Sequence, residues 1–260
     1  MPGFSVWRIR GWRIPRTAWA ALAAALLLVA GHWVDAAIDS SRQQAMAAFL
    51  NGRTIVIDPG HGGPDPGSMA ASGLLEKDVV LDIGLRLRDL LQAAGAKVVM
   101  TREDDSDISG LPNASLRERW RAAHRKRLEI AEASNADAVI SIHANAVPSP
   151  RWFGAQTFYS PNGGEASRRL AEHIQRELRH ITGGTDRTIS NHVEHYMLNR
   201  IRLPAVIVEV GFLSNPNEAE LLGRPSYRQR LAWSIFVGLA HFLAEQATPP
   251  VTKPPQAHGP

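Results

Sequence analysis

TIVIDPGHGG, at residues 54–63, is the stretch of the chain that decides the fold prediction. Its first five residues form an apolar run that ends at Asp58, and the glycine-rich turn around His61 stops the run, which is typical of a buried strand. Similar short apolar runs predict further strands at 97–101, 138–143, 156–159 and 204–209. Apolar residues at helical spacing predict helices at 78–94, 115–134, 165–181 and 226–245. Strands that alternate with helices predict a single α/β domain in three layers, with a twisted, mostly parallel central sheet flanked by helices.

The composition of the 260 residues fits one folded domain with additional segments at both ends. Hydrophobic residues make up 44% and charged residues 21%, which is ordinary for a globular protein. The chain has no cysteine, which excludes disulfide frameworks, iron–sulfur clusters, cysteine-ligated zinc and thiol nucleophiles. We expect a basic leader with a hydrophobic helix at 1–37, a connector at 38–51, one catalytic domain at 52–246 and a disordered, proline-rich tail at 247–260.

The leader contains a charge-free run at residues 17–34 that follows four arginines. A helix of this length spans roughly 27 Å at about 1.5 Å per residue, close to the thickness of a bilayer core. Because positive charge stays on the cytoplasmic side, we expect export of the domain to the extracytoplasmic face of the membrane or into the cell wall. The run favours an uncleaved anchor slightly over a signal peptide cleaved near Ala37, and a buried core helix is the remaining interpretation.

The net charge of +4 does not indicate a nucleic-acid partner. Outside residues 1–37 the chain carries 25 basic and 24 acidic residues, so the excess of positive charge belongs to the leader. A nearly neutral domain lacks the electrostatic attraction on which binding to phosphate backbones depends. We therefore expect no nucleic acid among the partners, and a membrane contact through residues 17–34.

Three predicted strands end in, or run into, an ionisable residue: His61, His143 and Glu209. Ligand sites in open α/β sheets form beyond the carboxyl ends of the strands, so these side chains are expected at one place. The two histidines also have ordinary interpretations, His61 as a solvated loop residue and His143 as a hydrogen-bonded core histidine. Glu209 is the strongest signal, because a carboxylate after an apolar strand is costly to bury unless it binds a cation, is well hydrogen-bonded or stays protonated.

Two histidines and a glutamate suit a tetrahedral zinc whose fourth position is left for water. A separate carboxylate beside that water acts as general base and then as general acid. Glu76, ahead of the predicted helix at 78–94, is a further acidic candidate, or simply an acid that interacts with the helix dipole. The residues alone therefore indicate a zinc hydrolase, without the spacing of the HExxH motif.

Four segments resemble, in order, the motifs of the zinc-dependent N-acetylmuramoyl-L-alanine amidases. They are TIVIDPGHGGPDPGS at 54–68, GLLEKDVVLDIGLRLRDLL at 73–91, ADAVISIHAN at 136–145 and PAVIVEVGFLSNPNEAELL at 204–222. Within that family, the RWFGAQTFY segment at 151–159, the single catalytic domain and the hydrophobic N-terminal segment are most similar to the sporulation or germination-specific amidases that act on spore cortex.

The resemblance implies one Zn²⁺ per chain, bound by His61, Glu76 and His143, with Glu209 as the catalytic glutamate. The implied reaction is hydrolysis of the amide between N-acetylmuramic acid and the L-alanine of the peptidoglycan stem peptide, in cortex maturation or germination. Many family members carry wall-binding repeats that this chain lacks, so proximity to peptidoglycan would come from the membrane segment or from an accessory protein. A zinc peptidase that cuts within the stem peptide and a catalytically silent wall-binding activator are the alternatives.

Further residues carry secondary predictions. Asp58 either orients His61 or stabilises the turn before the proline. Arg127 and Asn145 are candidate substrate contacts, with helix-surface and turn roles as the alternatives. His192 and His195 would form a metal pair only if their loop folds over the site.

Overall fold

The computed structural model describes residue 19 and residues 46–182, 185–192 and 195–247. The chain divides into two units, Met1–Ala45 and Met46–Pro260, and the fold below is that of the second. In the described part, no helix combines the length and the apolar character needed to cross a bilayer. The predicted membrane segment at 17–34 lies outside the described residues except for Trp19, as does nearly all of the predicted tail.

The core of the domain is a five-stranded sheet in the order β2-β1-β3-β5-β4. Neighbouring strands are parallel except for β4, which pairs with β5 in the antiparallel sense. This confirms the mostly parallel sheet that the alternating pattern predicted. The strands are β1 (Thr54–Pro59), β2 (Lys97–Met100), β3 (Ala138–Asn145), β4 (Gln156–Tyr159) and β5 (Ala205–Phe212).

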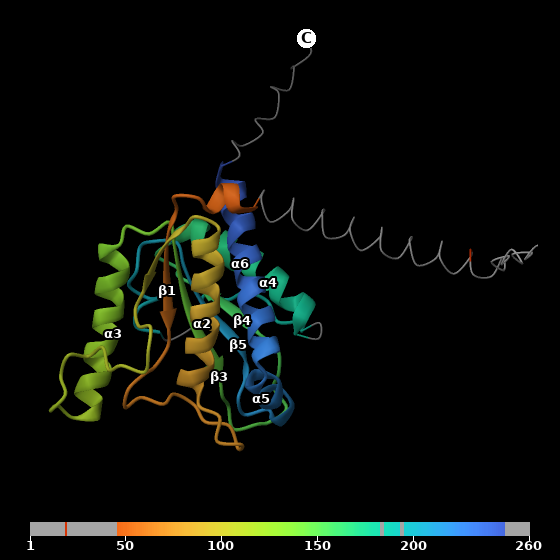
Figure 1. Cartoon of the computed structure of the whole chain (residues 1–260). Coiled ribbons are helices and arrows are strands. Elements are labelled where there is room, and N and C mark those ends of the chain that lie inside the picture. Colours follow the sequence, from red (N-terminus) through yellow and green to blue (C-terminus); the bar gives the residue numbers. More distant parts are fainter. Residues whose placement is uncertain (1–18, 20–45, 183–184, 193–194, 248–260) are drawn as a thin grey trace, which may run out of the picture. The chain divides into compact units, whose positions relative to one another are not determined.

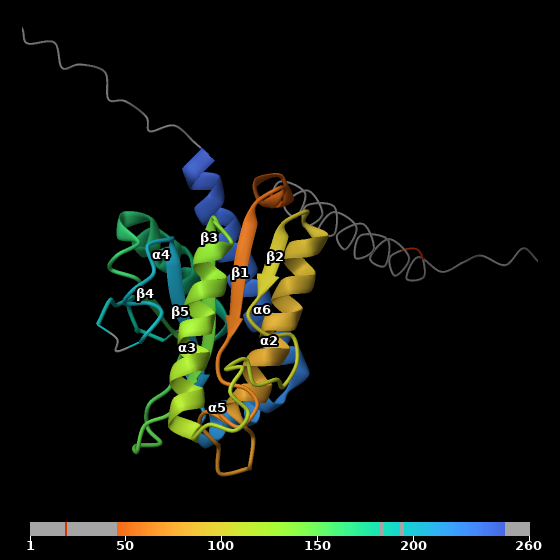
Figure 2. The same ribbon diagram turned by 90° about the vertical axis from the view of Figure 1, so that its left-hand side faces the viewer.

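Helices cover both faces of the sheet and complete the three layers (Figures 1 and 2). On one face, α2, α4 and α6 pack together over the larger hydrophobic core, and on the other face α3 packs over a smaller one. A short helix, α5, follows β5. The helices are α2 (Glu76–Ala93), α3 (Leu116–Ala133), α4 (Gly164–Ile181), α5 (Pro216–Gly223) and α6 (Pro225–Ala247).

Strand alternation decides which polar side chains face α3. Val56, Val139 and Ile207 belong to the smaller core on the α3 face. Because side chains alternate between the faces of a sheet, Asp58 and Glu209, two positions further along their strands, lie on the same face. Asp58 is in register with Ser141, and His143 is in register with Glu209. The carboxyl ends of the three central strands therefore deliver their polar residues to one side of the sheet.

Two local features differ from the sequence prediction. The strand β5 continues through Glu209 to Phe212, because the residues after the glutamate are again apolar and buried. The helix α5 was not predicted, although its start has a clear signal in the sequence. Asn215 caps it by accepting hydrogen bonds from the backbone of Asn217 and Glu218, and Pro216 follows in the first turn.

Candidate active site

The structure brings together His61, Glu76 and His143, which lie far apart in the sequence. Glu76 Oε1 is 3.0 Å from His61 Nε2 and 3.1 Å from His143 Nδ1. The carboxylate also accepts hydrogen bonds from the backbone N–H groups of Ser68 and Ala144, which fix its position at the start of α2. The three potential ligand atoms all lie within 4.8 Å of one another, and no other such group occurs in the described residues.

Backbone geometry allows the loop 60–67 to pack against these side chains. His61 has a positive φ of 60°, in the left-handed region that non-glycine residues seldom adopt. A Cβ atom at Gly60 would lie 2.3 Å from the His143 ring, and one at Gly67 would lie 2.7 Å from both Glu76 and His61. Glycine is therefore required at both positions for the loop to approach the cluster so closely.

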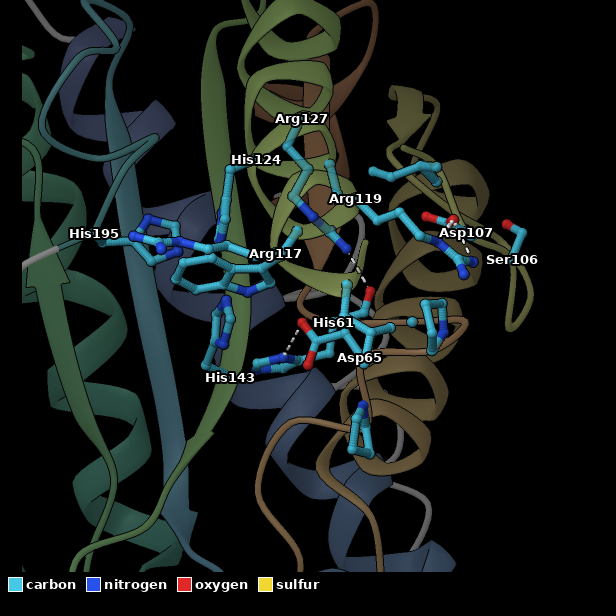
Figure 3. Close-up of a pocket in the computed structure, with 17 residues that line it drawn as sticks. His61, Asp65, Ser106, Asp107, Arg117, Arg119, His124, Arg127, His143 and His195 are labelled. Carbon is cyan, nitrogen blue, oxygen red and sulfur yellow. Dashed lines mark hydrogen bonds and ion pairs between the residues drawn. The ribbon is translucent and has the colours of Figure 1, made fainter. Parts of the chain in front are cut away.

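Asp65, rather than Asp58, orients the ring of His61. Asp65 Oδ2 lies 2.9 Å from His61 Nδ1, which directs Nε2 towards Glu76 (Figure 3). The prediction that Asp58 orients His61 is wrong, because the Asp58 carboxylate has other partners on the α3 side of the sheet. The carboxylate is fully buried there and accepts hydrogen bonds from Thr101 Oγ1 at 2.6 Å and Ser141 Oγ at 2.7 Å.

Arg127, from α3, supports the loop that carries His61. The buried guanidinium donates to Asp58 and to the carbonyl oxygens of Pro59 and His61. Although burial raises the pKa of Asp58, the Arg127 charge and the two hydroxyl donors hold it well below its ordinary value. Arg127 also lines the cavity described below, and its substrate contact stays a prediction. The backbone of Asn145 bonds to Leu213, and a substrate contact of the Asn145 side chain stays a prediction.

The electrostatics of the cluster favour a bound positive charge. Burial lowers the pKa of His61, but its hydrogen bonds to Asp65 and Glu76 outweigh this effect and raise the pKa to about 9. Burial disfavours the ionised form of Glu76, yet the two histidines hold its pKa well below the ordinary range. Two imidazole nitrogens and a carboxylate oxygen are also a donor set found in catalytic zinc sites with an open fourth position. The residues therefore fit a zinc ion.

Glu209 lies beside this cluster without a hydrogen-bond partner for one carboxylate oxygen. Its register position is opposite His143, and its Oε2 atom is buried and unpaired in the described part of the chain. Burial raises the pKa of Glu209 to about 7, although the nearby charges of His143 and His61 lower it. A carboxylate with a pKa in this range is suited to accept and return a proton.

A cavity of about 340 Å³ adjoins His61 and His143 and extends along α3. Two further histidines line it, His124 from α3 and His195 from the segment before β5 (Figure 3). His124 was missed by the sequence analysis, since a histidine on a charged helix carries no distinctive signal. The ring of His195 packs 5.4 Å from that of His143, whereas His192 is exposed and does not line the cavity. The predicted metal pair of His192 and His195 is therefore not formed.

Comparison with known proteins links this site to one family. The family described as N-acetylmuramoyl-L-alanine amidase matches residues 55–241. The chain is 42% identical over 201 residues to the germination-specific N-acetylmuramoyl-L-alanine amidase of Bacillus subtilis, which covers 77% of this chain and 84% of that protein. It is 30% identical over 235 residues to the N-acetylmuramoyl-L-alanine amidase AmiA of Escherichia coli, with 74% and 76% covered. The CwlD amidase of Clostridioides difficile, solved in complex with the GerS lipoprotein, superposes with a TM-score of 0.72 at 36% identity, over 75% of this chain and 100% of that one.

Proposed function

Because the chain belongs to the N-acetylmuramoyl-L-alanine amidase family, we propose that it hydrolyses the amide between N-acetylmuramic acid and L-alanine with one zinc ion held by His61, Glu76 and His143. The observation that carries this proposal is the cluster of two histidines and a glutamate with the unpaired carboxylate of Glu209 beside it. The alternative of a catalytically silent wall-binding protein gives no reason for a carboxylate oxygen to be buried there without a partner.

Each side chain of the site has a distinct task in this reaction. When bound, zinc polarises the amide carbonyl and lowers the pKa of the attacking water. Asp65 holds the ring of His61 so that Nε2 faces the metal position. Glu209 accepts a proton from the attacking water and returns it to the departing nitrogen of L-alanine as the C–N bond breaks.

The similarity to the germination-specific relative suggests where this amidase acts. We propose a substrate in spore cortex peptidoglycan, cleaved during maturation or germination, on the extracytoplasmic side of a membrane that residues 17–34 reach. The related CwlD amidase was solved with a lipoprotein, and we propose an accessory protein of that kind for this chain. We propose the boundaries expected from the sequence, with the leader at 1–37, the connector at 38–51, the catalytic domain at 52–246 and the tail at 247–260.

The experiment that tests the function is a Glu209→Gln substitution with two measurements on one preparation. The variant keeps the size of the side chain but loses its basic oxygen, so zinc content should stay near that of the parent. Amidase activity should fall roughly 100-fold or more, the usual scale for a positioned acid–base group. Glu220→Gln is the matched control, because Glu220 is exposed on α5, away from the site, and pairs with Arg224 at the surface.

Mass analysis of the products separates the amidase from a zinc peptidase. An amidase frees an intact stem peptide that begins with L-alanine, whereas a peptidase leaves L-alanine attached to the sugar. Fragments of the second kind alone, released by the parent protein, would contradict the proposed reaction. Loss of zinc together with activity in the Glu209→Gln variant would instead identify Glu209 as a metal ligand.

A further inference from the structure

The cavity beside the metal site continues into a groove along α3. We call this outer part the α3 groove and define it by Leu116, Trp120 and His124. Leu116 and Trp120 are large apolar side chains, yet they are 65% and 52% exposed. Exposed apolar side chains at the open end of a cavity mark a place where a ligand packs.

A series of ring contacts connects Trp120 to the metal site. Trp120 packs edge-on against His124 at 4.6 Å between ring centroids, His124 against His195 at 5.7 Å, and His195 against His143 at 5.4 Å. All three contacts have interplanar angles between 73° and 86°, the favourable edge-to-face arrangement of aromatic rings. The indole of Trp120 is therefore supported by a row of packed rings that ends at a predicted zinc ligand.

The charged side chains around the cavity are mostly neutralised within the protein. Asp65 pairs with His61, Asp107 with Arg119, and Arg127 with Asp58. Of the charged residues that line the cavity, Arg117 is the one for which the described part of the chain shows no ion pair, and it is exposed. A stem peptide carries carboxylates and calls for several free cations, whereas a sugar ring is uncharged.

We propose that the α3 groove binds the sugar that carries the scissile amide, with the ring face of the sugar packed on Trp120. This inference rests on the proposed function, because it concerns the sugar side of the same substrate. Sugar rings present a face of C–H groups, which an exposed indole accommodates, and hydroxyl groups, which the neighbouring polar side chains meet. Trp120 then acts as a specificity-determining residue on the sugar side of the bond.

Kinetics of the full-length protein provide the first test. Trp120→Ala should raise KM for polymeric peptidoglycan about 3- to 10-fold, the scale of one aromatic contact, and leave kcat within about twofold. Trp152→Ala is the matched control, because Trp152 is 56% exposed but does not line the cavity, and its KM should match the parent. Zinc content should be equal in all three proteins. Trp120→Phe, which keeps a ring, should recover most of the loss. Should the alanine variant fold poorly, Trp120→Gln, which removes the ring but keeps a longer side chain, takes its place and should show the same rise in KM.

A disaccharide fragment of the glycan product and the released stem peptide serve as probes for which part of the substrate lies in the groove. The indole N–H resonance of Trp120, identified by its absence in the Trp120→Phe protein, should shift on addition of the peptide-free disaccharide of N-acetylglucosamine and N-acetylmuramic acid. The free stem peptide should leave it unchanged. A shift with the stem peptide alone, or an unchanged KM in Trp120→Ala, would overturn the proposal. Failure of the proposed function gives a different result, since the parent protein would then release no stem peptide that begins with L-alanine.

Discussion

Replacing Arg127 by methionine should be among the most destabilising single changes in the domain. The guanidinium is buried and donates to Asp58 and to two backbone carbonyl oxygens of the His61 loop. Methionine fills a similar volume but leaves the fully buried Asp58 charge with only the hydroxyl groups of Thr101 and Ser141. Breaking a buried pair by removing one partner costs about 3–5 kcal/mol, and we expect a loss in that range.

Arg119→Met provides the matched control on the same helix. Arg119 pairs with Asp107 at 2.6 Å, but both side chains retain contact with solvent. Pairs of this kind contribute about 1 kcal/mol or less, so the free energy of unfolding of the control should be close to that of the parent. Equilibrium unfolding of the zinc-free proteins in urea, followed by circular dichroism, measures both differences.

A double-mutant cycle with Asp58→Asn tests the explanation itself. Asparagine removes the charge that Arg127 neutralises, so the double variant should lose clearly less stability than the two single variants added together. Additive losses, or a cost for Arg127→Met no larger than that for Arg119→Met, would refute the account of a buried ion pair. The zinc affinity of the Arg127→Met variant should fall as well, because the guanidinium that it lacks donates to the carbonyl oxygen of His61.

Three further predictions concern the base, the metal and the leader. In zinc-free protein, Glu209→Gln should raise the melting temperature at pH 8 and not at pH 4. The pKa of Glu209 in the folded protein is about 7, above the ordinary 4.5, so the parent protein loses stability as the pH rises from 4.5 through 7. A lower melting temperature of the variant than of the parent at pH 8 would contradict this. His143→Ala should weaken zinc binding roughly 100-fold or more, since even loss of an outer partner costs 10- to 100-fold, while His192→Ala should keep one zinc per chain by elemental analysis. Full-length protein should sediment with membranes and a chain without residues 1–45 should not; a free mature form that begins near Ala37 would show a cleaved signal instead.

The sheet and the meeting point of its polar residues were predictable from the sequence, because both depend on local pattern. Apolar runs of strand length mark β1, β3 and β5 in the sequence. The carboxyl ends of parallel strands lie at the same edge of the sheet. His61, His143 and Glu209 end or follow these runs, so their convergence required no knowledge of side-chain packing. Glu76 needed the family resemblance, since an acid at a helix start has an ordinary explanation.

The partners of these residues were not predictable, because they depend on which way each side chain turns. Asp58 is nearer to His61 in sequence than Asp65 is, yet its carboxylate is bound by Thr101, Ser141 and Arg127 and not by the His61 ring. Asp65 reaches that ring because the turn between them reverses the chain, with Gly62 and Asp65 forming a backbone bridge. His124 lines the cavity because α3 packs near the segment before β5, where its ring contacts that of His195. No local sequence pattern indicates this contact.

The buried pair of Arg127 and Asp58 is better explained by position than by stability. Well-packed apolar residues often stabilise a protein as much as a buried ion pair does. Stability alone therefore gives no reason to place charges between the sheet and α3. The same guanidinium, however, donates to the carbonyl oxygen of His61, a residue whose backbone lies in a region that costs of order 1–3 kcal/mol. A neutral side chain of the same size has no donors to hold that carbonyl. The ion pair thus keeps Arg127 in place, and Arg127 keeps His61 in the strained conformation that directs its Nε2 atom towards Glu76.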